Sequence, residues 1–149
     1  MSNLRRVLAA LGAAVLSTAA LSTITAAPAS AIPRTNYCGS AYAFLKSWPI
    51  LWRNQSGGYI DVYYNSSNGY NCAIARGNDN VLSSVWELQV GIRRSGGTWV
   101  MDGDKAGQNF TRYAGPVYVS APNTCIDLYG SFEASGGGSG QIIESVHCG

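Results

Sequence analysis

The sequence predicts an all-β protein: an antiparallel β-sandwich or small barrel with two disulfides, preceded by a cleavable signal peptide. Short segments of alternating apolar and polar residues recur between residues 32 and 149, and Gly, Pro and Asn turns separate them. This part of the chain also holds all four Trp, all nine Tyr and all three Phe, and aromatic residues favour strands. Because the segments lack the spacing of βαβ units, we expect antiparallel pairing.

Residues 1–31 have the features of an export signal. Arg5-Arg6 gives a basic start, and residues 7–20 are apolar apart from small Ser, Thr and Gly. Ala29-Ser30-Ala31 then matches the small-x-small pattern after which signal peptidase cuts. We therefore expect residues 32–149 to form a single all-β domain that is secreted.

An uncleaved membrane anchor is the alternative interpretation of the leader. Residues 7–27 approach the length of about 20 apolar residues that a helix needs to span a bilayer. However, Ser and Thr dilute the second half of this stretch, and no stop-transfer cluster of charges follows it. We expect cleavage, and no membrane contact after it.

Removing the leader also removes the net charge. The full chain carries ten Lys and Arg and eight Asp and Glu, so that without Arg5-Arg6 it has eight of each sign. Nucleic-acid binders need clustered cations to neutralise phosphates. The mature part has one adjacent basic pair, Arg93-Arg94, which lies beside a predicted turn. We therefore expect no nucleic-acid partner.

The mature part contains four cysteines, which predict two disulfides in a secreted domain of this size. They are Cys38, Cys72, Cys125 and Cys148. A zinc site is the alternative, but no C-x-x-C spacing occurs and His147 is the sole histidine, so we expect no metal. Three pairings are possible. We favour Cys38–Cys72 with Cys125–Cys148, because this pairing fastens the two ends of the domain separately.

The first half of the mature part predicts strands joined by tight turns. In chain order they are residues 42–47, 59–64, 72–75, 86–92 and 98–101. The first is expected to end before Trp48-Pro49. Asn68-Gly69 and Gly96-Gly97 tolerate the positive φ that hairpin turns require. In the 86–92 segment, the alternation places four apolar side chains in the core: Trp86, Leu88, Val90 and Ile92.

The second half continues the pattern with less regular alternation. The expected strands are residues 109–113, 117–120, 125–129 and 142–148. Gly115-Pro116 and Pro122-Asn123 are turn signals between them. The glycine-rich run 136–140 has the composition of a flexible loop before the last strand.

The sequence contains no arrangement of residues typical of catalysis, so we expect neither enzyme activity nor a cofactor. His147 adjoins Cys148, and no G-x-S-x-G elbow occurs. Asp102-Gly103-Asp104 matches the start of a calcium loop but lacks the ligands that should follow. Glycoside hydrolysis needs two facing carboxylates. The sequence leaves open whether any two of these lie together: Asp61, Glu87, Asp102, Asp104, Asp127, Glu133 and Glu144.

Several short motifs run from the start of the mature part to the last residue. They are Tyr37-Cys38-Gly39-Ser40, Tyr64-Asn65-Ser66-Ser67-Asn68-Gly69-Tyr70-Asn71-Cys72, Tyr113-Ala114-Gly115-Pro116-Val117-Tyr118, Cys125 and Cys148-Gly149. In this order they resemble the spore-associated protein A family, small exported proteins of spore-forming actinobacteria. The resemblance implies a secreted or spore-surface protein and carries over no catalytic residues. At the hairpin tip, Asn68-Gly69-Tyr70 stands where the family more often has Thr-Gly-Lys.

These observations predict a secreted, non-catalytic protein of the spore or cell surface that acts by contact. Its partners would be spore or cell-wall components. The sequence does not reveal the oligomeric state. One alternative is an extracellular carbohydrate-binding module whose exposed aromatics lie near predicted turns: Trp48, Trp52 and Tyr70. The other is a secreted protease or glycosidase inhibitor, with Arg53-Asn54 or Arg93-Arg94 as its basic site.

Overall fold

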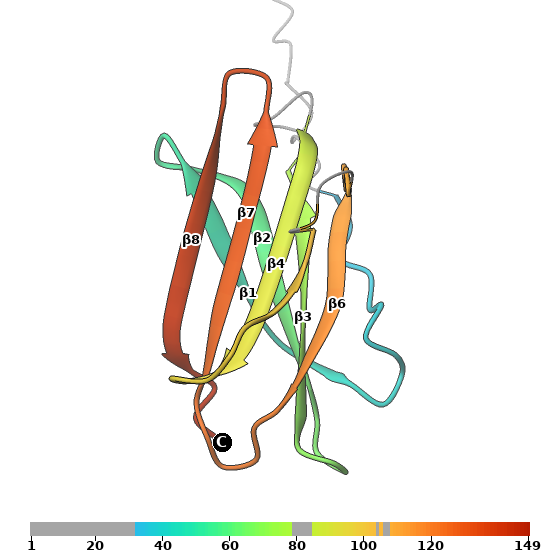
Figure 1. Ribbon diagram of the computed structural model, residues 1–149. Coiled ribbons are helices and arrows are strands. Elements are labelled where there is room, and N and C mark those ends of the chain that lie inside the picture. The colour runs from blue at the N-terminus through green and yellow to red at the C-terminus, as the bar shows by residue number, and fades with distance from the viewer. Residues whose placement is uncertain (1–31, 79–84, 104, 106–107) are drawn as a thin grey trace, which may run out of the picture.

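The structure, a computed structural model, describes residues 32–78, 85–103, 105 and 108–149. The expected signal peptide, residues 1–31, lies outside the described part. The chain forms two four-stranded antiparallel sheets that face each other (Figure 1). The predicted all-β fold is confirmed, and it is a sandwich. No helix within the described ranges has the length and apolar character needed to cross a membrane.

Each sheet combines strands from separate parts of the chain. Sheet A has the order β1-β2-β3-β6 and consists of β1 (Ala43–Trp52), β2 (Gln55–Asn65), β3 (Tyr70–Gly77) and β6 (Tyr113–Ser120). Sheet B has the order β5-β4-β7-β8 and consists of β4 (Val85–Arg94), β5 (Val100–Asp102), β7 (Ile126–Ala134) and β8 (Gly137–Val146). The connections from β3 to β4, from β5 to β6 and from β6 to β7 cross between the sheets.

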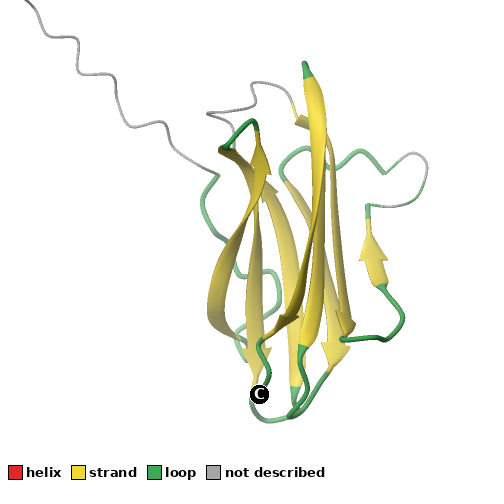
Figure 2. Ribbon diagram, turned by 90° about the vertical axis from the view of Figure 1, so that its left-hand side faces the viewer, coloured by secondary structure: helices red, strands yellow, loops and turns green. Residues whose placement is uncertain are grey.

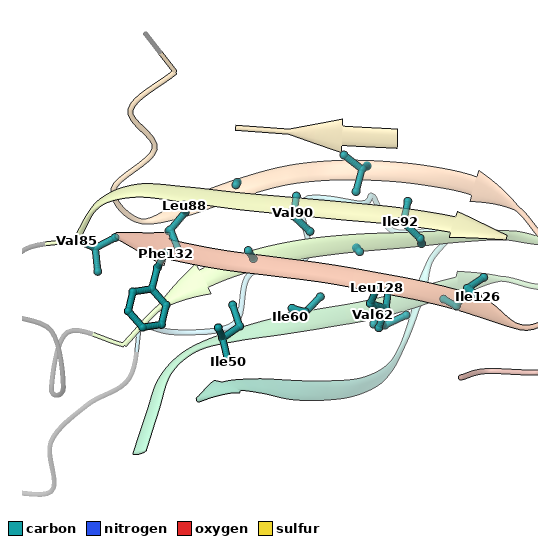
Figure 3. Close-up of a cluster of buried hydrophobic side chains, with 14 of the residues drawn as sticks. Ile50, Ile60, Val62, Val85, Leu88, Val90, Ile92, Ile126, Leu128 and Phe132 are labelled. Atoms are coloured by element: carbon teal, nitrogen blue, oxygen red, sulfur yellow. The ribbon is translucent and has the colours of Figure 1, made fainter. Parts of the chain in front are cut away.

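The core lies between the sheets, and alternate residues of the central strands fill it (Figure 3). The largest fully buried side chains that sheet B contributes are Leu88, Val90, Ile92, Ile126, Leu128 and Phe132. Ile50 and Ile60 of sheet A pack against them. At Gly130 on β7, an added Cβ would lie 2.6 Å from Cγ1 of Ile60. Glycine at this position therefore lets the two sheets approach each other closely.

The segment 32–42 covers the outer face of sheet A (Figure 2). The side chain of Ile32 is 2% exposed, and its carbonyl accepts a hydrogen bond of 3.0 Å from Nη1 of Arg76. The carbonyl of Pro33 accepts one of 2.9 Å from the Tyr113 hydroxyl. The residue that directly follows the expected cleavage point therefore packs onto the domain.

Two disulfides fasten the ends of the domain, as predicted. Cys38–Cys72 joins the segment 32–42 to β3, and Cys125–Cys148 joins the start of β7 to the chain end. The described residues contain no free cysteine. A cross-link over loops of these lengths stabilises a fold by roughly 3–4 kcal/mol in the chain-entropy account.

The first strand is longer than predicted. It was expected to end before Trp48-Pro49, but β1 continues through Pro49 to Trp52. Proline lacks an amide hydrogen and is therefore tolerated where one side of a strand has no neighbour. Since β1 is the edge strand of sheet A, it can contain Pro49 and still pair with β2.

Three further predictions, all for the second half of the chain, are wrong. Residues 109–112 form no strand, and only Tyr113 of that predicted segment belongs to β6. Gly115-Pro116 lies inside β6, where a register shift against β3 accommodates it. The run 136–140 is no loose loop, because Gly137 to Gly140 pair with β7. The predicted core position of the Trp86 side chain lies outside what the structure describes.

Candidate functional site

Trp48, the first aromatic predicted to bind, is half-buried and packs against the core. Its Nε1–H donates to Nε2 of His147 over 3.3 Å. The ammonium group of Lys46 lies 3.8 Å from the centre of its ring, in cation–π geometry. Much of this ring is therefore engaged in contacts within the molecule.

Trp52 and Tyr70, the other two predicted aromatics, lie at opposite ends of sheet A. Trp52 ends β1, pairs with Gln55 and packs half-buried against the core. Tyr70 begins β3, pairs with Asn65 and is 39% exposed. The structure therefore does not gather the three aromatics into one strip.

The two tryptophans lie along the side of the sandwich where β1 approaches β8. Side chains of β8 bind the backbone of β1 there. The Ser139 hydroxyl donates to the carbonyl of Leu51 over 2.6 Å, and the Leu51 amide donates to Oε1 of Gln141 over 3.4 Å. These bonds satisfy backbone groups of an edge strand, which reduces its tendency to pair with another chain.

Two of the acidic residues considered for catalysis are buried in ion pairs. Asp61 accepts a 2.8 Å bond from Nε of Arg76 and a further bond from the Ser47 hydroxyl. Asp127 accepts a 2.8 Å bond from Nε of Arg93. Both carboxylates therefore hold neighbouring strands together.

The pKa of Asp127 is lowered although the residue is buried. Burial acts to raise it, but hydrogen bonds from the Ser145 amide, the Ser95 hydroxyl and Arg93 outweigh that effect, together with the charge of Arg93. Ser145 has a positive φ of 54° and lies where the β7–β8 register shifts. Asp127 therefore fixes this irregularity in β8.

His147 is likewise held by contacts within the fold. Burial lowers the pKa of its imidazole, and the positive charge of Lys46 lowers it further. Its Nε2 accepts the hydrogen bond from Trp48, which requires an unprotonated nitrogen. The described residues include no group of three or more His, Cys, Asp or Glu able to hold a metal ion.

The two basic sites considered for an inhibitor differ in their surroundings. Arg93 is held by Asp127 and stacks on Trp99, with 4.4 Å between guanidinium and ring centre. Arg53 and Asn54 form the exposed tip of the β1–β2 hairpin, with φ of 47° and 64°. Arg94 lies close to the Cys125–Cys148 disulfide, because it pairs with Ile126 and the adjacent Ser95 amide donates to the carbonyl of Cys125 over 3.0 Å.

The outer face of sheet B contains a shallow polar depression, here called the trough. It has a volume of about 350 Å³, which is within the range of small-molecule sites. Its residues come from β4, β7 and β8, in the front layer of Figure 1: Glu87, Gln89, Tyr129, Ser131, Phe132, Glu133, Gly138, Ser139 and Gly140. None of the sequence motifs described above predicts this depression.

The strand register explains how these residues meet. Glu87 lies directly opposite Glu133, and Gln89 lies opposite Ser131. The next strand places Gly138 opposite Glu133. Successive side chains of a strand point to opposite faces, so the same alternation that buries the apolar residues brings these polar ones to one outer surface.

Hydrogen bonds order the middle of the trough. The amide Nε2 of Gln89 donates to Oε1 of Glu87 over 2.8 Å, and the Ser131 hydroxyl donates to Oε1 of Gln89 over 3.2 Å. Among the described residues, neither Glu87 nor Glu133 forms an ion pair with a cationic side chain. The trough therefore presents two carboxylates without a counter-charge.

Tyr129 lines one end of the trough, and Trp99 packs against it; these two rings are here called the aromatic wall. The two rings meet edge to face, with centroids 6.4 Å apart. A Cβ at Gly91 would lie 3.2 Å from Cε3 of Trp99, so the absence of a side chain there lets Trp99 lie against the sheet. A Cβ at Gly140 would lie 3.3 Å from the Tyr129 hydroxyl, which shows that Tyr129 reaches across β8.

The chain was compared with proteins of known family and structure. It is 34% identical over 121 residues to the protein named spore-associated protein A of Streptomyces coelicolor, a match that covers 81% of this chain and 72% of that relative. The chain belongs to the spore-associated protein A family. No protein-family model matches the chain, and no solved structure is significantly similar to it.

Membership of the spore-associated protein A family confirms the resemblance drawn from the cysteine frame and the tyrosine-rich motifs. The sequence contains one sign of the trough: the polar or glycine residues Glu87, Gln89 and Gly91 alternate with buried apolar ones, which places them on the outer face of their strand. What the sequence lacks is the register that places β7 and β8 beside them.

Proposed function

We propose that the mature chain is a secreted, non-catalytic protein of the spore or cell surface, and that it acts by contact through the outer face of sheet B. The name of its Streptomyces coelicolor relative supports association with spores. The two disulfides support a location outside the cytoplasm, where such bonds persist.

The observation that carries this proposal is the difference between the two outer faces. The outer face of sheet A is covered by residues 32–42 and tied to them by Cys38–Cys72. The outer face of sheet B instead carries the trough and the aromatic wall, where polar groups and half-buried rings reach the surface. Aromatic rings beside polar groups are typical of contact surfaces.

The experiment is fractionation of the producing culture into spores, cell walls and medium. We expect the mature protein in a surface fraction, and we expect Tyr129→Ala to shift it into the medium. Glu144→Gln is the matched control, because Glu144 is exposed toward the other end of β8 and does not line the trough. Wild-type protein found wholly in the medium would refute the proposal, as would equal retention of wild type and Tyr129→Ala.

A further inference from the structure

We infer that the trough binds a glycan that carries free amino groups, such as a chain of glucosamine units. This inference rests on the proposed contact function and adds the chemical class of the ligand. Three features of the trough support it: its charge, its aromatic wall and the bare backbone of its floor.

The charge of the trough selects a cationic ligand. Glu87 and Glu133 are opposite each other on neighbouring strands, and like charges in that position destabilise a sheet. No cationic side chain of the described residues pairs with either one. An ammonium group placed between the two carboxylates would relieve the repulsion and form charge-assisted hydrogen bonds.

The aromatic wall selects a ring-shaped ligand over a simple polyamine. Tyr129 is half-buried, held at its edge by Trp99, and extends over Gly140 with its hydroxyl beside the trough. A fixed aromatic ring offers apolar area to the C–H face of a sugar, while its hydroxyl can bond a sugar hydroxyl. Ser131 and Gln89 supply further hydrogen-bonding groups on the same surface.

The floor of the trough allows the ligand to come close to the sheet. Gly138 and Gly140 both line it and have no side chain to raise the surface. The trough is an open depression on a sheet face, which suits a chain that continues at both ends better than an enclosed small molecule. With about 350 Å³ of space, the contact would involve only a few sugar units of a longer polymer.

The test is a binding titration of the purified mature protein with three soluble probes: a glucosamine hexamer, an N-acetylglucosamine hexamer and spermine. Calorimetry measures each affinity. We expect the glucosamine hexamer to bind at least about tenfold more tightly than the acetylated hexamer, because one charge-assisted bond of roughly 1.5 kcal/mol corresponds to that factor. We also expect it to bind more tightly than spermine, which has ammonium groups but no sugar ring to lie against Tyr129. Added salt should weaken the binding.

Variants locate the interaction. Glu87→Gln and Glu133→Gln should each weaken binding of the glucosamine hexamer about tenfold, and Tyr129→Ala should weaken it as well, whereas Glu144→Gln should bind like wild type. Circular dichroism and thermal unfolding establish that each variant is folded. Absence of glucosamine binding, equal binding of the acetylated hexamer or spermine, or insensitivity to both Glu substitutions would overturn the inference. Retention at the spore or wall surface in the fractionation experiment would still support the proposed contact function.

Discussion

Glu87 and Glu133 are cross-strand neighbours on β4 and β7, and both carboxylates belong to the same trough. A sheet optimised for stability alone would place opposite charges or apolar groups at such a pair. Active and binding sites often keep arrangements that reduce stability, because function requires them. The pair is therefore the clearest indication that this surface has a role besides folding.

The first prediction concerns the energy of that pair. Glu133→Gln removes one of the two charges while keeping the size of the side chain, so it should raise the free energy of unfolding by up to about 1 kcal/mol. Urea unfolding at neutral pH and low salt measures the change, and Glu144→Gln serves as the control. A Glu133→Gln variant less stable than wild type would show that Glu133 is held by a favourable contact.

The second prediction concerns Arg76, which joins β3, β2 and the segment 32–42. Arg76→Met would leave Asp61 buried without its cationic partner and release the carbonyl of Ile32. Loss of one member of a buried ion pair costs roughly 3–5 kcal/mol. We expect a corresponding decrease in the free energy of unfolding and faster tryptic cleavage after the exposed Arg34.

Adding Asp61→Asn to Arg76→Met is the matched control, because it also removes the unpaired charge. The double variant should recover part of the stability, but its segment 32–42 should remain sensitive to trypsin. Equal stability of Arg76→Met and wild type would contradict the assignment of Arg76 as the link between the segment and the sheet.

The third prediction concerns the hydroxyl of Tyr63, which is buried without a hydrogen-bond partner among the described residues. Burial raises its pKa, and the charge of Asp61 raises it further, while Arg34 and Arg76 act in the opposite direction. A buried hydroxyl without a partner costs about 1–3 kcal/mol. Tyr63→Phe should therefore leave stability unchanged or raise it by about 1 kcal/mol, as measured by thermal unfolding. A large loss of stability would reveal a bond to that hydroxyl.

The fourth prediction concerns His147 and pH. Because burial and Lys46 lower the pKa of His147 in the folded state below 6.5, the folded protein binds fewer protons than the unfolded chain. The stabilising contribution of the neutral imidazole is therefore complete above pH 6.5 and decreases as the pH falls through the lowered pKa. NMR titration of this sole histidine should give a pKa below 6.5.

His147→Gln tests the same point through stability. Glutamine can still accept the hydrogen bond from Trp48 but does not titrate. Its unfolding free energy should depend less on pH between about 7.5 and 5 than that of wild type. A histidine pKa above 6.5, or identical pH profiles for the two proteins, would contradict the buried, neutral imidazole.

The fold class and the disulfides could be predicted because both depend on local patterns. The alternation of Leu88, Val90 and Ile92 identified a core-facing strand, and the cysteine positions favoured the observed pairing. The glycine-rich run was misjudged, because Gly137 to Gly140 are held in β8 by pairing with β7 and not by their own preference. Tertiary pairing overrides a weak local preference of this kind.

The trough, the proposed binding surface, was harder to predict because it depends on which strands become neighbours. Trp48 and Trp52 lie in segments that the sequence marks as turns, yet β1 continues through them and turns both rings toward the core. Glu87 is far in the chain from Ser131 and Gly138, and no local signal connects it to them. Only the order β4-β7-β8 brings them together.

Carboxyl footprinting tests the central claim most directly. The mature protein, free or bound to isolated spore and wall material, is treated with carbodiimide and a labelled amine, and mass spectrometry then measures the labelling of each carboxylate. We predict that binding protects Glu87 and Glu133 while Glu144, toward the other end of β8, stays as reactive as in the free protein. Unchanged labelling of Glu87 and Glu133 in protein that is demonstrably bound would contradict the account, since the contact would then lie elsewhere on the sandwich.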